Sequence, residues 1–185
     1  MADSESSRHW LHDLTRFMKH FPLKIEDVSL IVLKGHLLTE ELLREFLHSK
    51  VLHPSPLRDA RLRYIQCVHL ARSLSTDPGD WVWDALDRLN VIRNKLSHAL
   101  EPTGLDDAIN AFGELVRRND PRELPDTREI PAELRELFTP LGFALFSVHA
   151  ALSAMLRVKP VSLLGGAVTI PSNQAVQPTA EDGGG

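Results

Sequence analysis

The chain has 185 residues, of which 43% are hydrophobic and 25% charged, and its formal net charge is −4 at pH 7. This length and composition are typical of one globular domain and exclude an intrinsically disordered chain. The acidic balance excludes a uniformly basic nucleic-acid-binding surface, but it is compatible with a local basic groove.

Cys67 is the single cysteine in the sequence, which excludes a disulfide framework and every Cys-rich zinc or iron–sulfur site. A lone cysteine also favours a reducing compartment, and the polar residues 1–7 do not resemble a signal peptide. We therefore expect a cytoplasmic protein, in which Cys67 is a small core residue.

Helical periodicity dominates the sequence. The spacing of apolar residues predicts helices over residues 4–21, 26–51, 56–74, 81–98, 105–119 and 131–158. We expect Ser55 to cap the third of these helices, and Pro140 to kink the last one. The predicted fold is an all-α, up-and-down bundle of five to six helices.

Two segments lie outside the predicted helices. Residues 119–131 contain several prolines and charges, which indicates a linker or a long exposed loop. Residues 159–185 are rich in Gly, Pro, Ser and Thr, which predicts a disordered tail. The expected organisation is therefore a single helical domain over residues 1–158, followed by that tail.

Residues 139–156 contain no Asp, Glu, Lys or Arg, and this length approaches that of a bilayer span. The segment contains Ser147, His149 and Ser153, however, and an apolar helix is also what the centre of a soluble bundle requires. We expect a core helix and no membrane partner. The tryptophans at the start of the fourth helix, Trp81 and Trp83, are expected to pack the end of the bundle.

The most informative stretch is Arg93-Asn94-Lys95-Leu96-Ser97-His98, called here the Arg–His segment. Arg93 continues the core-facing stripe of its helix, where a guanidinium is costly unless it is paired or borders a polar cleft. A permanent cation, an amide and an imidazole lie within two helical turns. This combination suits phosphate chemistry, because Arg holds phosphate oxygens and His transfers protons near neutral pH.

The Arg–His segment resembles the signature of the HEPN superfamily (higher eukaryotes and prokaryotes nucleotide-binding), in which an Arg is followed by a His after four to six residues. The resemblance implies a HEPN-like fold and a metal-independent endoribonuclease of toxin or phage-defence type, acting as a homodimer. Arg93 would stabilise the phosphorane, His98 would act as general acid or base, and Asn94 would orient either His98 or the phosphate. No cofactor is implied.

Other HEPN proteins are inactive, so the resemblance also implies an alternative: a non-catalytic adapter that binds nucleotide, RNA or a protein partner. A cognate antitoxin or regulatory protein is a further expected partner. In one branch that is paired with antitoxins, a tyrosine follows the His by two residues. Leu100 stands there in this chain, which argues against control by modification of that tyrosine.

The helical geometry separates the two main residues. Arg93 and His98 are five positions apart, about 140° around a straight helix. They can therefore serve one phosphate only if the Arg reaches across, the helix frays before Pro102, or a second chain completes the site. The structural alternatives are an ion pair for Arg93 and a helix-dipole interaction for His98.

His36 and Glu40 form an i, i+4 pair, which would either support the cleft or be an ordinary surface pair. Several basic residues are candidates for attracting RNA. The predicted RNA-binding residues are Lys95, Arg58, Arg61 and Arg88. The nine histidines form no recognisable zinc motif, so no metal site is predicted.

Overall fold

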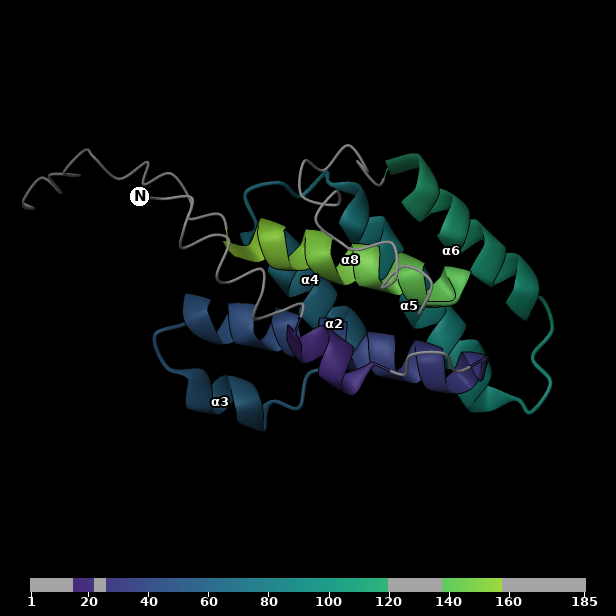
Figure 1. The fold of residues 1–185 in the computed structure, drawn as a ribbon. Coiled ribbons are helices and arrows are strands. Elements are labelled where there is room, and N and C mark those ends of the chain that lie inside the picture. Colours follow the sequence, from purple (N-terminus) through teal and green to yellow (C-terminus); the bar gives the residue numbers. More distant parts are fainter. Residues whose placement is uncertain (1–14, 22–25, 120–137, 158–185) are drawn as a thin grey trace, which may run out of the picture.

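The computed structural model describes residues 15–21, 26–119 and 138–157, and these residues are mostly helical with no β-strand among them (Figure 1). Residues 15–20 form a short helical segment. The longer elements are α2 (Val28–Lys50), α3 (Pro54–Asp59), α4 (Tyr64–Leu74), α5 (Trp81–His98), α6 (Leu105–Asn119) and α8 (Pro140–Arg157). The predicted all-α class is confirmed.

The ends of α2, α5 and α6 agree with the predictions to within two residues, because local signals define them. Asp27 caps α2 by accepting a hydrogen bond from the Leu30 amide at 3.1 Å. Asp80 caps α5 in the same way, through the Val82 amide at 2.8 Å.

The single helix predicted over residues 56–74 is wrong, since the chain forms α3 and α4 with a break between them. Arg61 has a positive φ of 47° in this break, which no α-helix accommodates. The start of α4 is then capped by Gln66, whose side-chain Oε1 accepts a hydrogen bond from the Arg63 amide at 2.8 Å. Ser55 lies inside α3 and does not cap it; His53 occupies the cap position.

The last helix also differs from its prediction. α8 begins at Pro140, so this proline occupies the first helical position and starts the helix instead of kinking it. The predicted helical residues 4–14 and 131–137, most of the linker and the tail beyond residue 158 lie outside the described residues.

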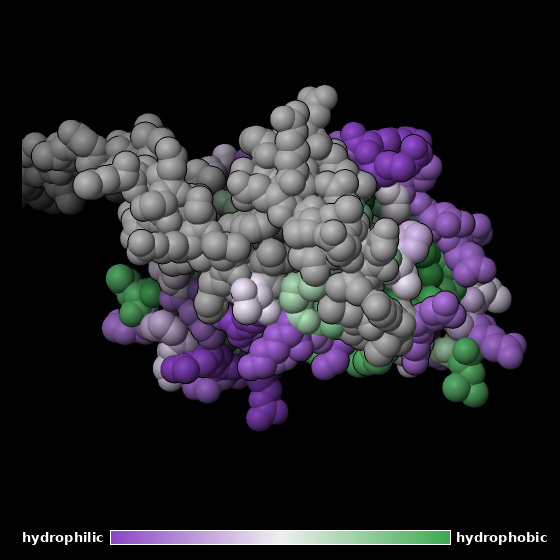
Figure 2. Space-filling view, viewed as in Figure 1, coloured by the Kyte–Doolittle hydropathy of each residue, from purple (hydrophilic) through white to green (hydrophobic). Residues whose placement is uncertain are grey.

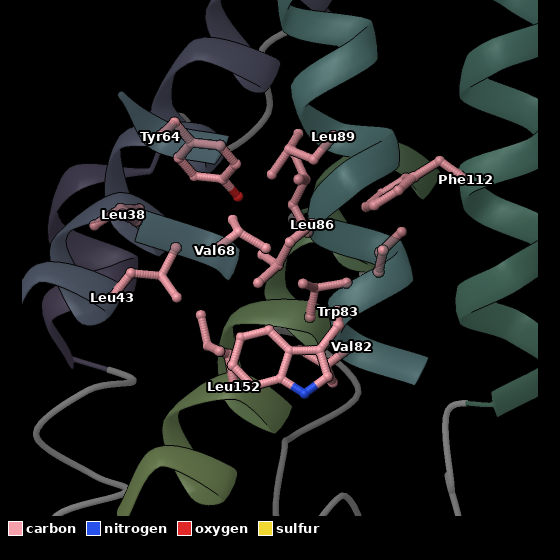
Figure 3. Close-up of a cluster of buried hydrophobic side chains, with 14 of the residues drawn as sticks. Leu38, Leu43, Tyr64, Val68, Val82, Trp83, Leu86, Leu89, Phe112 and Leu152 are labelled. Atoms are coloured by element: carbon pink, nitrogen blue, oxygen red, sulfur yellow. The ribbon is translucent and has the colours of Figure 1, made fainter. Parts of the chain in front are cut away.

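The hydrophobic core lies between α2, α4, α5 and α8, and α6 packs against α5 and α8. Figure 3 shows Leu86 and Leu89 of α5 directed toward Val68 and Tyr64 of α4. Trp83 is fully buried, and its indole N–H donates to the Asp77 carbonyl at 2.9 Å. Trp81 packs against the core and Cys67 is fully buried, so the predictions for these three residues are confirmed.

The described helices show no membrane span: none of them is both long and apolar enough to cross a bilayer. In α8, the apolar residues Leu145, Val148 and Leu152 are fully buried in the protein core. Figure 2 shows a mostly hydrophilic surface on the described part of the visible face, with separate hydrophobic patches. The predicted core role of this helix is confirmed.

The contact between α2 and α8 depends on Gly35. A Cβ atom at this position would lie 2.7 and 2.9 Å from the two Cδ atoms of Leu145 and 3.1 Å from its Cγ. Leu145 is fully buried, so the side chain has little room to move away. The absence of a side chain at Gly35 therefore sets the distance between the two helices.

We predict that Gly35→Ala destabilises the protein by about 1–3 kcal/mol through overpacking, although alanine is the better helix former. Gly113→Ala is the matched control: this glycine lies in α6 with open space around its Cβ position, so alanine should stabilise the protein by about 0.5–1 kcal/mol. Urea unfolding of both variants measures these changes, and equal effects of the two substitutions would contradict the proposed contact.

Candidate functional site

The Arg–His segment forms the C-terminal turns of α5, as predicted. Arg93 is half-buried, and its Nη1 donates to Oδ1 of Asn94 at 3.3 Å. No carboxylate lies within ion-pair distance of Arg93 among the described residues. The expected alternative of an ion pair is therefore not found in this part of the chain, and the guanidinium retains donors for another ligand.

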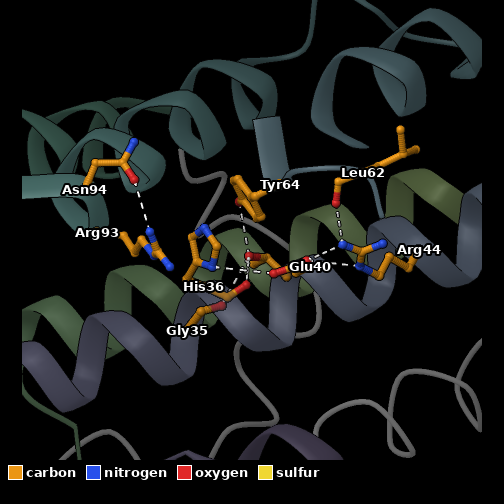
Figure 4. Close-up of polar contacts among 9 residues, drawn as sticks. Gly35, His36, Glu40, Arg44, Leu62, Tyr64, Arg93 and Asn94 are labelled. Atoms are coloured by element: carbon orange, nitrogen blue, oxygen red, sulfur yellow. Dashed lines mark hydrogen bonds and ion pairs between the residues drawn. The ribbon is translucent and has the colours of Figure 1, made fainter. Parts of the chain in front are cut away.

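His98 is the last residue of α5 and is exposed. The structure does not bring it to Arg93: Figure 4 shows Arg93 pointing toward α2, whereas no hydrogen bond or ion pair of His98 is found among the described residues. In the described part of the chain, no hydrogen bond or ion pair joins the two residues into one site.

Arg93 instead faces a set of polar residues between α2, α4 and α5, which we call the inter-helix polar cluster. Its members are His36, Thr39 and Glu40 of α2, Tyr64 of α4 and Arg93 of α5. The His36 and Tyr64 rings lie against each other, with centroids 3.8 Å apart and planes at 32°. The Tyr64 hydroxyl is 3.2 Å from Oγ1 of Thr39, which is fully buried.

Glu40 connects this cluster to the surface. Oε1 of Glu40 accepts two hydrogen bonds from Arg44, at 3.0 Å from Nε and 2.6 Å from Nη2. The same Nη2 donates to the Leu62 carbonyl at 2.7 Å, so the residue just before α4 is tied to α2. Oε2 of Glu40 lies 3.8 Å from Nδ1 of His36.

The expectation of an ordinary surface pair for His36 and Glu40 is wrong for the histidine, which is only 5% exposed. Burial is the main cause that lowers the pKa of His36 from 6.5 to about 4; Glu40 and Asn90 oppose the shift and Arg93 adds to it. His36 is therefore neutral at pH 7. Burial likewise raises the pKa of Tyr64 well above its usual range, so this phenol keeps its proton.

The predicted RNA-binding residues do not form one surface. Arg58 belongs to α3 and Arg61 follows it, whereas Arg88 reaches toward α6, where Nη1 lies 3.4 Å from the Ala111 carbonyl. Figure 1 shows α3 and α6 at opposite ends of the molecule. Lys95 donates to the Thr103 carbonyl at 2.8 Å and is the member of this set that belongs to the Arg–His segment.

Two members of the polar cluster escaped prediction. Tyr64 is the single tyrosine of the chain; the helix predicted over residues 56–74 puts it in a helix interior, whereas it is the first residue of α4. Thr39 alone is a weak sequence signal, because a threonine inside a helix is common; its hydroxyl donates to the His36 carbonyl at 3.0 Å and lies 3.2 Å from the Tyr64 hydroxyl. The sequence signal for this cluster is the presence of a polar residue, Thr39, among the apolar residues on the buried face of α2.

Two cavities in the described part of the chain lie away from the polar cluster. The larger, of about 630 Å³, lies between α6 and the start of α8, and its walls include Ile109, Val116 and Phe143. The smaller is lined by Arg88 of α5 and by Arg118 and other residues of α6. Among the described residues, no group of three or more His, Cys, Asp or Glu side chains is arranged to hold a metal ion.

No protein-family model, curated protein or solved structure matches this chain significantly. Chemically, the arrangement offers a cation with free donors at Arg93, an exposed imidazole at His98 and a buried neutral imidazole at His36. The HEPN resemblance stays a prediction that depends on the residues of the Arg–His segment.

The lowered pKa of His36 predicts a specific loss of stability in acid. Between pH 6.5 and about 4 the unfolded chain binds a proton at His36 that the folded chain excludes, so stability falls as the pH decreases. Between pH 7 and pH 5 wild type should lose about 2 kcal/mol more of its free energy of unfolding than His36→Gln.

Urea unfolding at the two pH values measures this difference. His69→Gln is the control, because His69 is exposed on α4 and lies outside the inter-helix polar cluster. Parallel pH profiles for wild type and His36→Gln would show that His36 is not held neutral by burial.

Proposed function

We propose that this protein is a metal-independent endoribonuclease of toxin or phage-defence type, with a HEPN-like fold and a site completed by a homodimer. The observation that carries the proposal is the state of Arg93: a half-buried guanidinium, without a carboxylate partner among the described residues, two turns or less from an exposed histidine. A cation that is partly desolvated and unpaired is costly in isolation, and an anionic ligand offsets that cost.

In the proposed reaction, the 2′-hydroxyl of a ribose attacks the adjacent phosphorus while a general base takes its proton. The phosphorus–O5′ bond breaks, and a general acid protonates the leaving oxygen. His98 serves as base or acid, and Arg93 stabilises the charge that develops on the phosphorane. Asn94 orients the guanidinium through the hydrogen bond described above. The products are a 2′,3′-cyclic phosphate and a 5′-hydroxyl.

The homodimer follows from the separation of the two residues on one helix. In a two-fold assembly, Arg93 of one chain and His98 of the other can face the same phosphate. Leu33 and Leu37 of α2, on either side of His36 in the sequence, are 44% and 48% exposed. We place these leucines in the dimer contact, since they are the large apolar side chains that α2 exposes. RNA, a second copy and a cognate antitoxin are the proposed partners, in the cytoplasm.

The alternative function is a non-catalytic adapter that binds nucleotide, RNA or a protein. One observation favours it: no residue of the Arg–His segment lines either of the two cavities described above. An adapter does not need an open site at Arg93, whereas the ribonuclease needs a cleft that only the dimer would form.

We predict that purified protein cleaves RNA in EDTA and leaves 2′,3′-cyclic phosphate ends. His98→Ala should lower the rate about 10²–10⁴-fold by removing proton transfer. Arg93→Ala should lower it about 10²–10³-fold, and Arg93→Lys should not restore it, because a point charge cannot replace the planar fork. Gel assays with end-group analysis measure these effects.

His69→Ala is the matched control, since His69 is exposed and belongs to α4. RNA carrying 2′-O-methyl groups should resist cleavage, because the nucleophile is blocked. Equal activity of wild type and His98→Ala would reject the enzymatic proposal in favour of the adapter.

The dimer is tested separately. Wild type should sediment as a dimer at micromolar concentration, and Leu37→Glu should sediment as a monomer, because a buried charge in the contact is costly. Leu74→Glu is the control: Leu74 is also 48% exposed, but it lies at the end of α4. A dimer that tolerates Leu37→Glu would show that α2 does not form the contact.

A further inference from the structure

The connection between α2 and α3 exposes aliphatic side chains. Leu52 is 93% exposed and Val51 is 36% exposed, whereas the nearby Leu57 and Leu62 pack against the core. Figure 2 shows a hydrophobic patch at the left edge of the molecule, where Figure 1 places this connection. A single exposed leucine is ordinary on a protein surface, so its meaning depends on the charges around it.

The same region carries cations without acidic partners. Its exposed basic residues are Lys50, Arg58, Arg61 and Arg63. None of them lies within ion-pair distance of a carboxylate among the described residues. Residues 46–63 contain these four cations and one acidic residue, Asp59, although the whole chain has a net charge of −4. We use the term basic tip for the four cations together with Val51 and Leu52.

The backbone holds two of these arginines in a fixed turn. Arg61 has a positive φ of 47°, which is costly for a residue with a Cβ atom. Its amide donates to the Arg58 carbonyl at 3.3 Å, and Arg44 of α2 donates to the carbonyl of the next residue, Leu62, at 2.7 Å. Strained residues that their surroundings hold in place cluster at functional sites, so an exposed arginine at such a position favours a role in binding.

We propose that the basic tip docks on an anionic lipid membrane. Val51 and Leu52 insert between the lipid headgroups, and the four cations bind the phosphate and carboxylate groups of the lipids. Figure 1 shows α3 at the periphery of the bundle, where a surface can approach it. The proposal goes beyond the proposed ribonuclease and does not depend on it.

A contact of this kind needs no spanning helix, so it is compatible with the core position of α8. The expectation of no membrane partner derives from the apolar segment 139–156 and does not concern the basic tip. The docked protein would lie on the membrane surface with its helical core unchanged.

Lipid explains the basic tip better than RNA does. Both carry phosphates, which arginine binds through two parallel hydrogen bonds. RNA offers no apolar phase for Leu52, and residues 50–63 contain no Phe, Tyr or Trp on which bases could stack. An anionic membrane surface offers acyl chains and phosphates side by side. The combination of an exposed leucine with unpaired cations therefore favours a membrane.

Flotation of the full-length protein with lipid vesicles tests the proposal. Wild type should bind vesicles made of equal parts of phosphatidylcholine and phosphatidylserine, and should bind pure phosphatidylcholine about 10²-fold more weakly. Added salt should release the protein, since ions screen the attraction. Failure to bind the mixed vesicles, or equal binding to both kinds of vesicle, would overturn the proposal.

Substitutions in the basic tip separate its apolar part from its charged part. Leu52→Ser should lower the affinity for mixed vesicles about tenfold by removing the apolar insertion. Arg58→Gln should lower it about fivefold by removing one cation. Arg61→Asn should have the same effect as Arg58→Gln. Because asparagine tolerates a positive φ, thermal unfolding of Arg61→Asn should show no loss of stability.

Two matched controls carry the same chemical changes elsewhere. Leu100→Ser alters another fully exposed leucine, and Arg118→Gln removes a cation at the end of α6, which lies at the opposite end of the molecule from α3 (Figure 1). Both controls should bind mixed vesicles as wild type does. Equal losses for Leu52→Ser and Leu100→Ser would overturn the proposal, because any exposed leucine would then have the same effect.

RNA is the competing ligand, since Arg58 and Arg61 are also predicted RNA-binding residues. Binding of the same variants to a 2′-O-methyl RNA, which cannot be cleaved, separates the two ligands. An affinity for this RNA that falls with Arg58→Gln, together with a lack of vesicle binding, would overturn the membrane proposal. The vesicle measurements are decisive whether or not the protein cleaves RNA.

Discussion

The burial of α2 against three neighbouring helices is the constraint on which the rest of the structure depends. α2 packs against α4, α5 and α8 at once, so its residues must suit partners on several sides. On the α8 side, Gly35 permits the close approach of Leu145. Directly after it in the sequence, His36 and then Thr39 bring polar atoms into the interior, where they must be satisfied by α4 and α5. The polar cluster therefore lies where α4 and α5 cover α2, and there Thr39 pairs with Tyr64 of α4 instead of with water.

Much of this fold could be predicted because its signals are local. The start of α5 is encoded by Asp80, and its apolar stripe made the half-buried place of Arg93 predictable from spacing alone. The break between α3 and α4 could not be found in this way. It depends on the positive φ of Arg61, a conformation that arginine rarely adopts, and on the hydrogen bond from Arg44 to the Leu62 carbonyl. Both involve the backbone, and neither leaves a pattern in the side chains.

The candidate site was predictable only in its parts. The spacing of residues within one helix identifies the i, i+4 pair of His36 and Glu40, and within another helix it identifies the Arg–His segment. It does not show that Arg93 faces His36, because the two residues belong to different helices. That proximity depends on how α2 and α5 are aligned along each other, which is a property of the packed core. Spacing alone also does not decide whether His36 supports a cleft or lies on an ordinary surface. Its burial follows from the Tyr64 ring, which is contributed by α4 and is brought there by the unpredicted break before it.

The hydrogen bond from Arg44 to the Leu62 carbonyl has a consequence for the evolution of this protein. Because the acceptor is a backbone oxygen, the side chain at position 62 is free to change without loss of the bond. Sequences related by descent would then show a constraint at Arg44 and Glu40 with no matching substitution at position 62. Methods that detect contacts from correlated substitutions would miss this link between α2 and the start of α4. α3, which buries none of its residues, could meanwhile vary in length and composition while the connection is preserved.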